Sequence, residues 1–300
     1  MKTLTIFTPA YNRAHTLGGT YESLCSQTSD DFLWLIVDDG SKDNTRELVE
    51  GWIAEGKIEI KYIYQENQGM HGAHNTAYDN IETELNTCID SDDFMPDDAV
   101  EKIISFWRKN GSDKYAGFMG LDVSLDGKII GERFPDGMRS TSTRRYYEEL
   151  GGSGDKKLVY RTDVVKKYPK YPIFEGEKLV GLSYLYNMID VDYEMLVSNE
   201  VYAIVDYQLD GSSFGMWKQY WDNPKGWIFF RKFELSQTKS LKRKIMNNVH
   251  YVSHSIRLRN KSFLAESPTK ILTFLCIVPG IILYLVNKKK VMKNSLFVKK

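Results

Sequence analysis

The sequence predicts an α/β protein with a Rossmann-like, mostly parallel sheet, helices on both faces and a small antiparallel edge. Short apolar runs of strand length alternate with helical patterns in the first third of the chain, at the spacing of βαβ units. Polar and acidic residues directly follow three of these runs. A basic, apolar and helical C-terminal tail is expected after this body.

The elements of the first half follow one another as strand and helix. Each strand is a short run of apolar or β-branched residues, and each helix lies between two strands. The expected strands cover 4–8, 32–37, 58–64 and 87–89, and the expected helices cover 16–25, 44–55, 72–81 and a stretch that begins at 97.

The second half departs from this alternation. Stretches 115–123 and 128–134 flank Asp126-Gly127, a favourable hairpin turn, and predict an antiparallel edge. The stretch 140–181 contains glycine clusters and prolines, so it is expected to be rich in loops. Loops beside a rigid sheet often carry substrate selection.

Charge is unevenly distributed along the chain. The 40 basic and 40 acidic side chains cancel, but 13 basic residues and a single acid lie in 241–300. By subtraction, the first 240 residues carry 27 basic and 39 acidic side chains. The acidic body argues against a nucleic-acid partner, and the basic tail favours an anionic membrane surface. We expect a catalytic domain over 1–230 and a helical region over 231–300.

The longest apolar run, 271–286, lies in this tail between Lys270 and Lys288-Lys289-Lys290. As a helix it would be about 24 Å long, short of the roughly 30 Å of a hydrocarbon core. A membrane span, an interfacial segment and a buried core helix are therefore all open. No secretory signal opens the sequence, so we expect a cytoplasmic body attached peripherally or integrally to the inner face of the cell membrane.

Three carboxylates, Asp90, Asp92 and Asp93, follow the fourth expected strand within four residues. Carboxylates this close repel one another and lose hydration, so a cation or a basic partner is expected there. Oxygen donors of this kind suit Mg²⁺ or Mn²⁺, which keep coordination places for phosphate oxygens.

The other unusual polar segments, 8–13 and 38–41, also lie at expected strand ends. Ligands of α/β sheets collect at the carboxyl ends of strands. Neither GxGxxG nor GxxxxGK[ST] follows the first strand, so these phosphate-cradling loops are missing. Phosphate is therefore expected to be held through a metal on the carboxylates.

Taken together, these residues resemble the family 2 glycosyltransferases, which are nucleotide-sugar enzymes with the GT-A fold, and in particular their bacterial polysaccharide-biosynthesis members. The match covers about the first hundred residues, in the order and spacing of the family. It rests on Thr-Pro-Ala-Tyr-Asn-Arg at 8–13, Val-Asp-Asp-Gly-Ser at 37–41, Asn67-Gln68-Gly69 with Ala73 and Asn75, and Ile-Asp-Ser-Asp-Asp at 89–93.

The resemblance implies a nucleobase pocket after the first two strands. Thr8, Ala10 and Tyr11 would line it, with Tyr11 against the ring of the base. Asp39 would accept hydrogen bonds from uracil or ribose, and Asp38 is the second candidate for this role.

The resemblance also implies roles for the acidic turn. Asp92 would bind the divalent ion that bridges the diphosphate, Asp90 would reach ribose or sugar hydroxyls, and Asp93 would support the sugar or the turn. Many relatives have Lys where this chain has Met70, which leaves positive character near the phosphates to His71, His74 or Arg13. The further substrate-binding candidates are Arg13, Asn67, Gly69, His71, Asn75 and Ser91.

Inverting transfer needs a base beside the acceptor hydroxyl. In relatives this carboxylate comes from a loop before a late helix, and here Glu175 and Glu177 precede the helical pattern at 182–189. Glu177 is the first candidate and Glu175 the second. The acid pair usual at the helix entrance is replaced by Gly181-Leu182, so an exposed acid pair without catalytic function is the open alternative.

The resulting prediction is an inverting, metal-dependent glycosyltransferase that moves a sugar from a UDP-sugar to a saccharide acceptor. The basic, apolar tail further predicts that this acceptor is linked to a lipid, as in polysaccharide or cell-wall assembly. Two alternatives remain open: a scaffold that binds nucleotide-sugar without turnover, and a serine hydrolase. The hydrolase rests on a GxSxG pattern at 211–215 followed by Asp222 and His250, a pattern that arises readily by chance.

Overall fold

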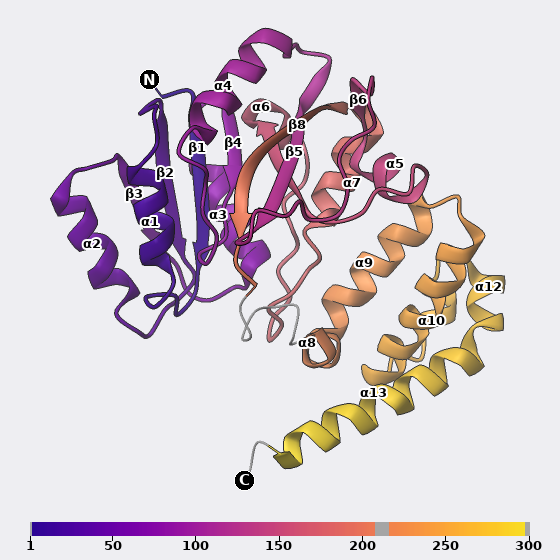
Figure 1. Ribbon diagram of the computed structural model, residues 1–300. Helices are drawn as coiled ribbons and strands as arrows, with labels where there is room; N and C mark the ends of the chain where they lie inside the picture. The colour runs from indigo at the N-terminus through magenta and orange to yellow at the C-terminus, as the bar shows by residue number, and fades with distance from the viewer. Residues whose placement is uncertain (1, 208–215, 298–300) are drawn as a thin grey trace. The chain divides into compact units, whose positions relative to one another are not determined.

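The computed structural model describes residues 2–207 and 216–297, and the chain divides into two compact units (Figure 1). The first unit comprises Met1–Lys170 and Leu185–Gln208, and the second comprises Tyr171–Tyr184 and Leu209–Lys300. The expected domain boundary after residue 230 falls inside helix α9 (Pro224–Gln237), within the second unit. The division follows the end of the sheet and not the shift in charge.

The first unit is built on a single sheet. Within the described residues, eight strands lie in the order β3-β2-β1-β4-β7-β5-β8-β6. Only β7 and β6 run antiparallel to their neighbours, which confirms the predicted mostly parallel sheet with an antiparallel part. The strands are β1 (Leu4–Ala10), β2 (Phe32–Asp38), β3 (Ile60–Tyr64), β4 (Leu85–Cys88), β5 (Tyr115–Ser124), β6 (Ser140–Thr141), β7 (Lys156–Arg161) and β8 (Glu194–Val205).

Strand β1 shows why helices cover both faces of the sheet. Leu4 and Ile6 belong to a buried cluster that includes Leu17 of α1 (Leu17–Cys25). Phe7, the residue directly after Ile6, packs edge-on against His74 of α3 (Met70–Asn80) with 5.0 Å between ring centroids. Successive side chains of a strand point to opposite faces, so β1 serves both layers. The remaining helices at the sheet are α2 (Thr45–Glu55), α4 (Ala99–Asn110), α5 (Thr143–Glu148), α6 (Thr162–Val165) and α7 (Ser183–Asp192).

The predicted hairpin around Asp126-Gly127 is wrong in its second strand. β5 is present, but its ladder partners are β7 and β8. In 128–134, the pairing with β5 is reduced to one isolated bridge between Ile129 and Val123. Gly131 has φ +72°, a left-handed conformation that turns the chain away and ends the ladder.

The stretch 140–181 holds more regular structure than expected. It contains β6, α5, β7 and α6, and β7 is a central strand between β4 and β5. Buried strands are usually recognised as continuous apolar runs. β7 begins with Lys156-Lys157, and this charged start conceals the strand in the sequence.

The second unit is helical, as predicted for the C-terminal region. The apolar run 271–286 is divided between two helices that meet at Cys276. Pro279 lies in the first turn of the second helix, where proline is tolerated. Among the helices described, none combines the length and hydropathy needed to cross a membrane. Besides α9, the helices are α8 (Met216–Asp222), α10 (Leu241–Arg257), α11 (Phe263–Glu266), α12 (Lys270–Leu275) and α13 (Ile277–Phe297).

Candidate active site

The carboxyl ends of four parallel strands meet at one edge of the sheet. In the ladder, Ala10 of β1 pairs with Asp38 of β2, and Asp38 pairs with Tyr64 of β3. The N–H of Ile89, just after β4, donates to the carbonyl oxygen of Phe7 at 3.0 Å. The three polar segments that follow β1, β2 and β4 therefore lie at the same edge, where α/β sheets bind ligands.

The loops after β1 and β2 are tied together by hydrogen bonds. Asn12 adopts a left-handed conformation, with φ +53°, that asparagine tolerates better than most residues. Its N–H donates to Ser41 Oγ at 2.8 Å, and its Oδ1 accepts from the N–H of Lys42 at 2.8 Å. The N–H of Asp39 also donates to the carbonyl oxygen of Ala10 at 2.8 Å. These bonds fix the two loops as one rim.

Asp38 is fully buried at this rim. Its Oδ1 accepts from the N–H of Ser41 at 2.8 Å, and its Oδ2 accepts from the hydroxyl of Tyr62 at 2.6 Å. Burial and the hydrogen bond to Asp38 raise the pKa of Tyr62. Asp38 therefore closes the turn after β2 and joins it to β3.

Asp39 is also buried and holds the segment that starts α3. Its Oδ1 accepts from the side-chain amide of Gln65 at 2.6 Å and from the N–H of Gln68 at 2.8 Å. Its Oδ2 accepts from the N–H of Gly69 at 2.7 Å. A charged acceptor bound to several N–H groups is a strong anchor. Asp39 thus determines where the Asn67–Gly69 segment lies relative to β2.

The three residues expected in the base pocket differ in accessibility. Thr8 is fully buried, and its hydroxyl accepts from the indole N–H of Trp34 at 2.9 Å, which is a core contact. Ala10 is buried as well. Tyr11, in contrast, is 45% exposed. Of these three side chains, that of Tyr11 is the one that a ligand can reach.

The segment from Asn67 to Asn75 begins with a glycine turn. Gly69 has φ +84° and occupies the N-cap position of α3, and Asn67 and Asn75 are half-buried. His71 and His74 are both buried on α3. Burial, followed by the neighbouring His71, lowers the pKa of His74 to about 3. His74 therefore supplies no positive charge near neutral pH.

The acidic turn after β4 divides into an outer and an inner part. Asp90 is exposed and Asp92 half-buried, whereas Ser91 and Asp93 are buried. Burial, followed by repulsion from Asp90, raises the pKa of Asp92, and the positive charge of Arg13 opposes this shift. The carboxylate of Asp92 therefore feels both the negative charge of Asp90 and the positive charge of Arg13, which lies in the loop after β1.

Asp93 points inward and supports the turn. Its carbonyl oxygen accepts from the Thr20 hydroxyl at 2.8 Å, and its Oδ1 accepts from the N–H of Asp206 at 3.1 Å. Burial raises the pKa of Asp93 to about 7, with Asp90 adding to the shift and Lys157 opposing it. Of the two roles expected for Asp93, these contacts favour support of the turn over support of the sugar.

Lys157 of β7 is a site residue that the sequence analysis missed. Its Nζ donates to the carbonyl oxygen of Cys88 at 3.2 Å, directly before the acidic turn. Burial acts to lower the pKa of Lys157, but the charges of Asp122, Asp93 and Asp90 outweigh it and raise the pKa. The acidic turn therefore already has an internal positive partner.

Asp122 of β5 is the second missed residue at this edge. It is buried, and its Oδ1 has no hydrogen-bond partner among the described residues. Burial raises the pKa of Asp122 to about 6 although Lys157 opposes the shift. Its position inside a long strand, without a motif around it, gave no signal in the sequence.

The oxygen donors of the acidic turn fit a shared divalent ion. Within 2–207 and 216–297, no three His, Cys, Asp or Glu side chains converge to hold an ion by themselves. Mg²⁺ and Mn²⁺ commonly bind to one or two carboxylates and complete their shell with substrate phosphates. Asp92, which is half-buried, and Asp90, which is exposed, match that donor set.

Glu177 and Glu175, the candidate bases, belong to the second unit. Glu175 is exposed. Glu177 is buried, and its carboxylate accepts from the N–H groups of Lys225 and Gly226, each at 2.9 Å. These N–H groups lie in the first turn of α9, so Glu177 caps this helix from another segment.

The GxSxG pattern of the hydrolase alternative, 211–215 with Ser212 and Ser213, lies outside the described residues. Asp222 and His250 both lie in the second unit. Burial, followed by the charge of Arg231, lowers the pKa of His250 to about 4.

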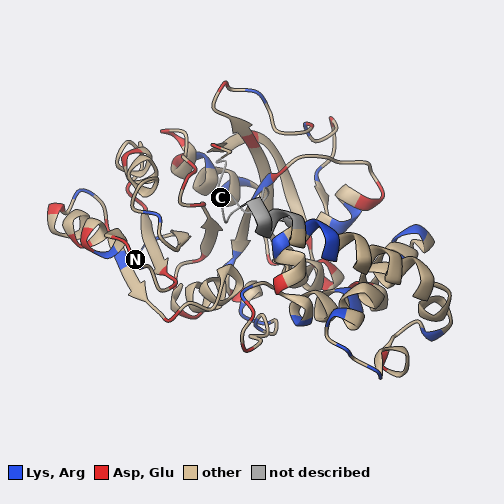
Figure 2. Cartoon of the chain, turned by 90° about the horizontal axis from the view of Figure 1, so that it is seen from below, with Lys and Arg blue, Asp and Glu red and all other residues tan. Residues whose placement is uncertain are grey.

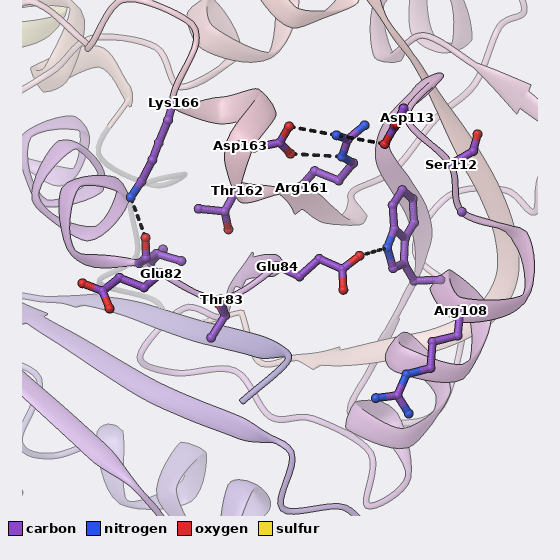
Figure 3. A pocket seen from close by; sticks show the side chains of 13 residues that line it. Glu82, Thr83, Glu84, Arg108, Ser112, Asp113, Arg161, Thr162, Asp163 and Lys166 are labelled. Carbon is purple, nitrogen blue, oxygen red and sulfur yellow. Dashed lines mark hydrogen bonds and ion pairs between the residues drawn. The ribbon is translucent and has the colours of Figure 1, made fainter. Parts of the chain in front are cut away.

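A separate pocket of about 630 Å³ lies at the opposite end of the strands, where β4 begins and β7 ends (Figure 3). Most of its charged side chains have partners within the first unit. Arg161 binds Asp163 through two hydrogen bonds of 3.0 and 2.8 Å, and Glu84 accepts from the Trp107 indole at 2.6 Å. These pairs support the sheet at this end.

Residues 5–168 match Glycosyl transferase family 2, which is more than half of the chain. An uncharacterized glycosyltransferase of Nostoc sp. is 31% identical over 175 residues, which are 54% of this chain and 52% of the relative. Chondroitin synthase of Escherichia coli is 32% identical over 127 residues, 42% of this chain and 18% of the relative. The chain thus spans about half or less of the length of these curated relatives.

Solved structures share the fold over nearly the whole chain. Staphylococcus aureus TarS 1-349 in complex with UDP-GlcNAc has a TM-score of 0.59 at 16% identity, covering 98% of this chain and 92% of that one. The mannosyltransferase PcManGT of Pyrobaculum calidifontis, in complex with GDP-Man and Mn²⁺, has a TM-score of 0.54 at 13% identity, covering 98% and 84%. These likenesses confirm the GT-A-like architecture. The match over 5–168 shows that the chain belongs to glycosyl transferase family 2.

Proposed function

We propose that the protein is an inverting, metal-dependent glycosyltransferase that moves a sugar from a UDP-sugar to a hydroxyl of a saccharide. One observation carries the proposal: Asp90 and Asp92 lie at the edge where the parallel strands end, and the positive charge of Arg13 acts on the carboxylate of Asp92. That edge offers oxygen donors and a basic side chain to a diphosphate. Family membership and the UDP-GlcNAc and GDP-Man complexes of the structural relatives support a nucleotide-sugar as the ligand.

The rim formed by the loops after β1 and β2 would bind the nucleoside. Tyr11, the exposed aromatic residue of the rim, would stack on the base. Asp39 would both anchor the Asn67–Gly69 segment and offer a carboxylate to uracil or ribose. The other residues proposed to form the donor site are Asn67, Gly69, Asn75 and Ser91, and the buried side chains of Thr8, Ala10, Asp38, His71 and Asp93 are proposed to support it from within the protein.

Asp92 would hold Mn²⁺ or Mg²⁺, and Asp90 would contact ribose or sugar hydroxyls. The Mn²⁺ in the GDP-Man complex of the mannosyltransferase supports this choice of ion. When bound, the ion would offset the negative charge of the leaving diphosphate. Arg13 would add a second positive group beside the phosphates.

The acceptor hydroxyl would lose its proton to a carboxylate. The acceptor oxygen then bonds to the anomeric carbon while the bond from that carbon to the diphosphate breaks, with inversion. Glu177 and Glu175 remain the candidates for this base. The exposed carboxylate of Glu175 is the more accessible of the two, because that of Glu177 is bound to α9.

The acceptor is proposed to be a saccharide linked to a lipid at the inner face of the cell membrane. The name of the chondroitin synthase relative supports polysaccharide assembly. The basic tail, with 13 basic residues and one acid in 241–300, supports an anionic surface nearby.

The test is a set of thermal-shift titrations with UDP and nucleotide-sugars, with Mn²⁺ or with a chelator, followed by transfer assays. UDP should raise the unfolding temperature only with the metal. Asp92→Asn should weaken UDP binding at least about tenfold, because a charge-assisted contact is worth roughly 1.5–3 kcal/mol. Asp136→Asn, at an exposed loop position, is the matched control and should bind as the wild type does.

The outcome also distinguishes the enzyme from the scaffold. Binding of a UDP-sugar without transfer to saccharide acceptors and without donor hydrolysis would support the scaffold. Failure of every nucleotide-sugar to bind in the presence of Mn²⁺ or Mg²⁺ would overturn the proposal.

A further inference from the structure

Helices α12 and α13 have an inverted distribution of side chains. Eight large apolar residues, here called the apolar stripe, repeat at intervals of three and four residues and are 40–82% exposed. Such intervals place all of them on one side of a helix. The apolar stripe consists of Ile271, Phe274, Leu275, Val278, Ile281, Ile282, Leu285 and Val286.

The opposite side of the two helices is small and polar, and it is buried against α10. Thr273 and Asn248 of α10 are joined by a hydrogen bond between Oγ1 and Oδ1. Cys276 Sγ lies 3.9 Å from the Ile245 carbonyl oxygen. At Gly280, a Cβ would lie 2.5 Å from Cγ1 of Val252, so only glycine permits this approach.

This arrangement is the reverse of a helix at an aqueous surface, which buries its apolar side. Isolated exposed apolar residues are common, but a contiguous stripe marks an interaction site. The stripe follows the helices over about 24 Å at 1.5 Å per residue. It faces away from α10, so an occupant can reach it from one side only.

Charge identifies the occupant. Lys270 precedes the apolar stripe, and Lys288 and Lys289 follow it, all three exposed. Among the charged residues of the C-terminal helices, Lys and Arg are far more frequent than Asp and Glu (Figure 2). The single acid of 241–300, Glu266, is paired with Lys232 at 3.6 Å. An apolar side bordered by lysines fits an anionic lipid surface.

A second copy of the chain fits this surface less well. Two stripes packed together would bring two strongly basic tails into contact, and each tail has 13 basic residues against one acid. Repulsion between like charges would oppose that dimer. An anionic bilayer instead attracts the same lysines and accepts the apolar side chains.

We infer that the apolar stripe docks the protein on an anionic membrane, with α12 and α13 lying in the plane of the interface. This rests on the proposed function in one respect, because it names the partner that would present a lipid-linked acceptor. The docking itself needs no turnover, so it can fail or succeed independently of the transferase activity.

The test is cosedimentation of the full chain with vesicles made of equal parts of phosphatidylcholine and phosphatidylglycerol. The wild type should bind these vesicles and should bind pure phosphatidylcholine more weakly. Ile282→Asp combined with Leu285→Asp should lower the partition constant at least about tenfold, because each residue loses apolar burial and gains a charge. The matched control is Ile53→Asp, an exposed apolar position on α2 of the first unit.

The lysines are tested separately. Lys288→Gln combined with Lys289→Gln should reduce binding to the anionic vesicles about tenfold and leave binding to phosphatidylcholine unchanged. UDP-induced thermal shifts of all variants, compared with wild type, check that the fold and donor binding are intact. The inference is overturned if wild type does not bind anionic vesicles, if the aspartate pair leaves binding unchanged, or if the stripe instead supports a dimer that Ile282→Asp dissociates.

Discussion

The carboxylate of Glu177 accepts a hydrogen bond from the N–H of Gly226 at 2.9 Å, in the first turn of α9. Its other oxygen accepts from the N–H of Lys225 at the same distance. The side chain of Asn223, at the N-cap position, makes no capping bond to the helix and instead accepts from the N–H of Lys178 at 2.6 Å. The segment around Glu177 and the start of α9 therefore cap each other, which is a structural use of the first candidate base.

Replacement of Glu177 should separate capping from catalysis. Glu177→Ala should lower the free energy of unfolding by about 1–2 kcal/mol, as the loss of a helix cap does. Glu177→Gln keeps one acceptor oxygen and should lose less. Urea unfolding measures both, with Glu175→Gln as the control at an exposed position. If Glu177→Gln retains its stability but stops transfer, Glu177 is the base; if Glu175→Gln alone stops transfer, Glu175 is.

Lys157 should prove essential to the acidic edge of the sheet. Lys157→Met leaves the charges of Asp122, Asp93 and Asp90 without their internal partner, and breaking a buried charge arrangement typically costs about 3–5 kcal/mol. Since Lys157 keeps some solvent contact, we expect a loss of ~2–3 kcal/mol. Adding Asp122→Asn should recover part of it. A double-mutant cycle by urea unfolding tests this, with Lys109→Met as the exposed control, and additive losses would contradict the coupling.

Asp39→Asn should disturb the start of α3 more than it disturbs the sheet. The asparagine can accept at one oxygen, but its NH₂ group would face N–H donors that Asp39 now binds. An unsatisfied buried donor costs about 1–3 kcal/mol, so stability should fall by that amount and UDP affinity should fall with it. Hydrogen exchange at Gly69 measures the local effect. Unchanged protection of this amide would show that Asp39 does not anchor the segment.

His74 should make the protein sensitive to acid. Burial, followed by the neighbouring His71, lowers its pKa to about 3 in the folded state, whereas the unfolded chain takes up the proton near 6.5. The stabilising contribution is therefore complete above pH 6.5 and is lost as the pH falls toward 3. Between about pH 7 and pH 5, this loss amounts to ~2 kcal/mol.

His74→Leu should remove that pH dependence. The difference in unfolding free energy between wild type and variant should then shift by ~2 kcal/mol from about pH 7 to about pH 5, to the disadvantage of the wild type. His15→Leu, at an exposed position, is the control variant. Urea titrations at both pH values decide the matter, and parallel pH profiles for wild type and His74→Leu would contradict a buried neutral imidazole.

The strand edge was predictable because parallel strands must end together. Asp38 and Asp90 follow apolar runs in the sequence, and their meeting at one edge is a property of the sheet. β7 was not predictable from its pattern, because Lys156 and Lys157 replace the apolar residues of a buried strand. Lys157, which makes the strand hard to recognise in the sequence, also provides the positive charge beside the acidic turn.

Other features depended on contacts between distant segments. Glu177 lies in a charged loop in the sequence, and only its bonds to Lys225 and Gly226 reveal that it caps a helix. In the tail, the sequence shows that the run 271–286 is apolar, but it does not show which side of the helices faces outward. The close approach at Gly280 to α10 determines which side of α13 remains outside.

The hydrogen bonds that join Asn12 to Ser41 and Lys42 have a consequence for the nucleotide preference proposed for this rim. Two loops fixed to each other before a ligand arrives need little ordering on association, so little conformational entropy is lost there. Such a rim cannot readily reshape itself around a larger or differently substituted base. A change of preference at this position would then require new side chains on an unchanged backbone.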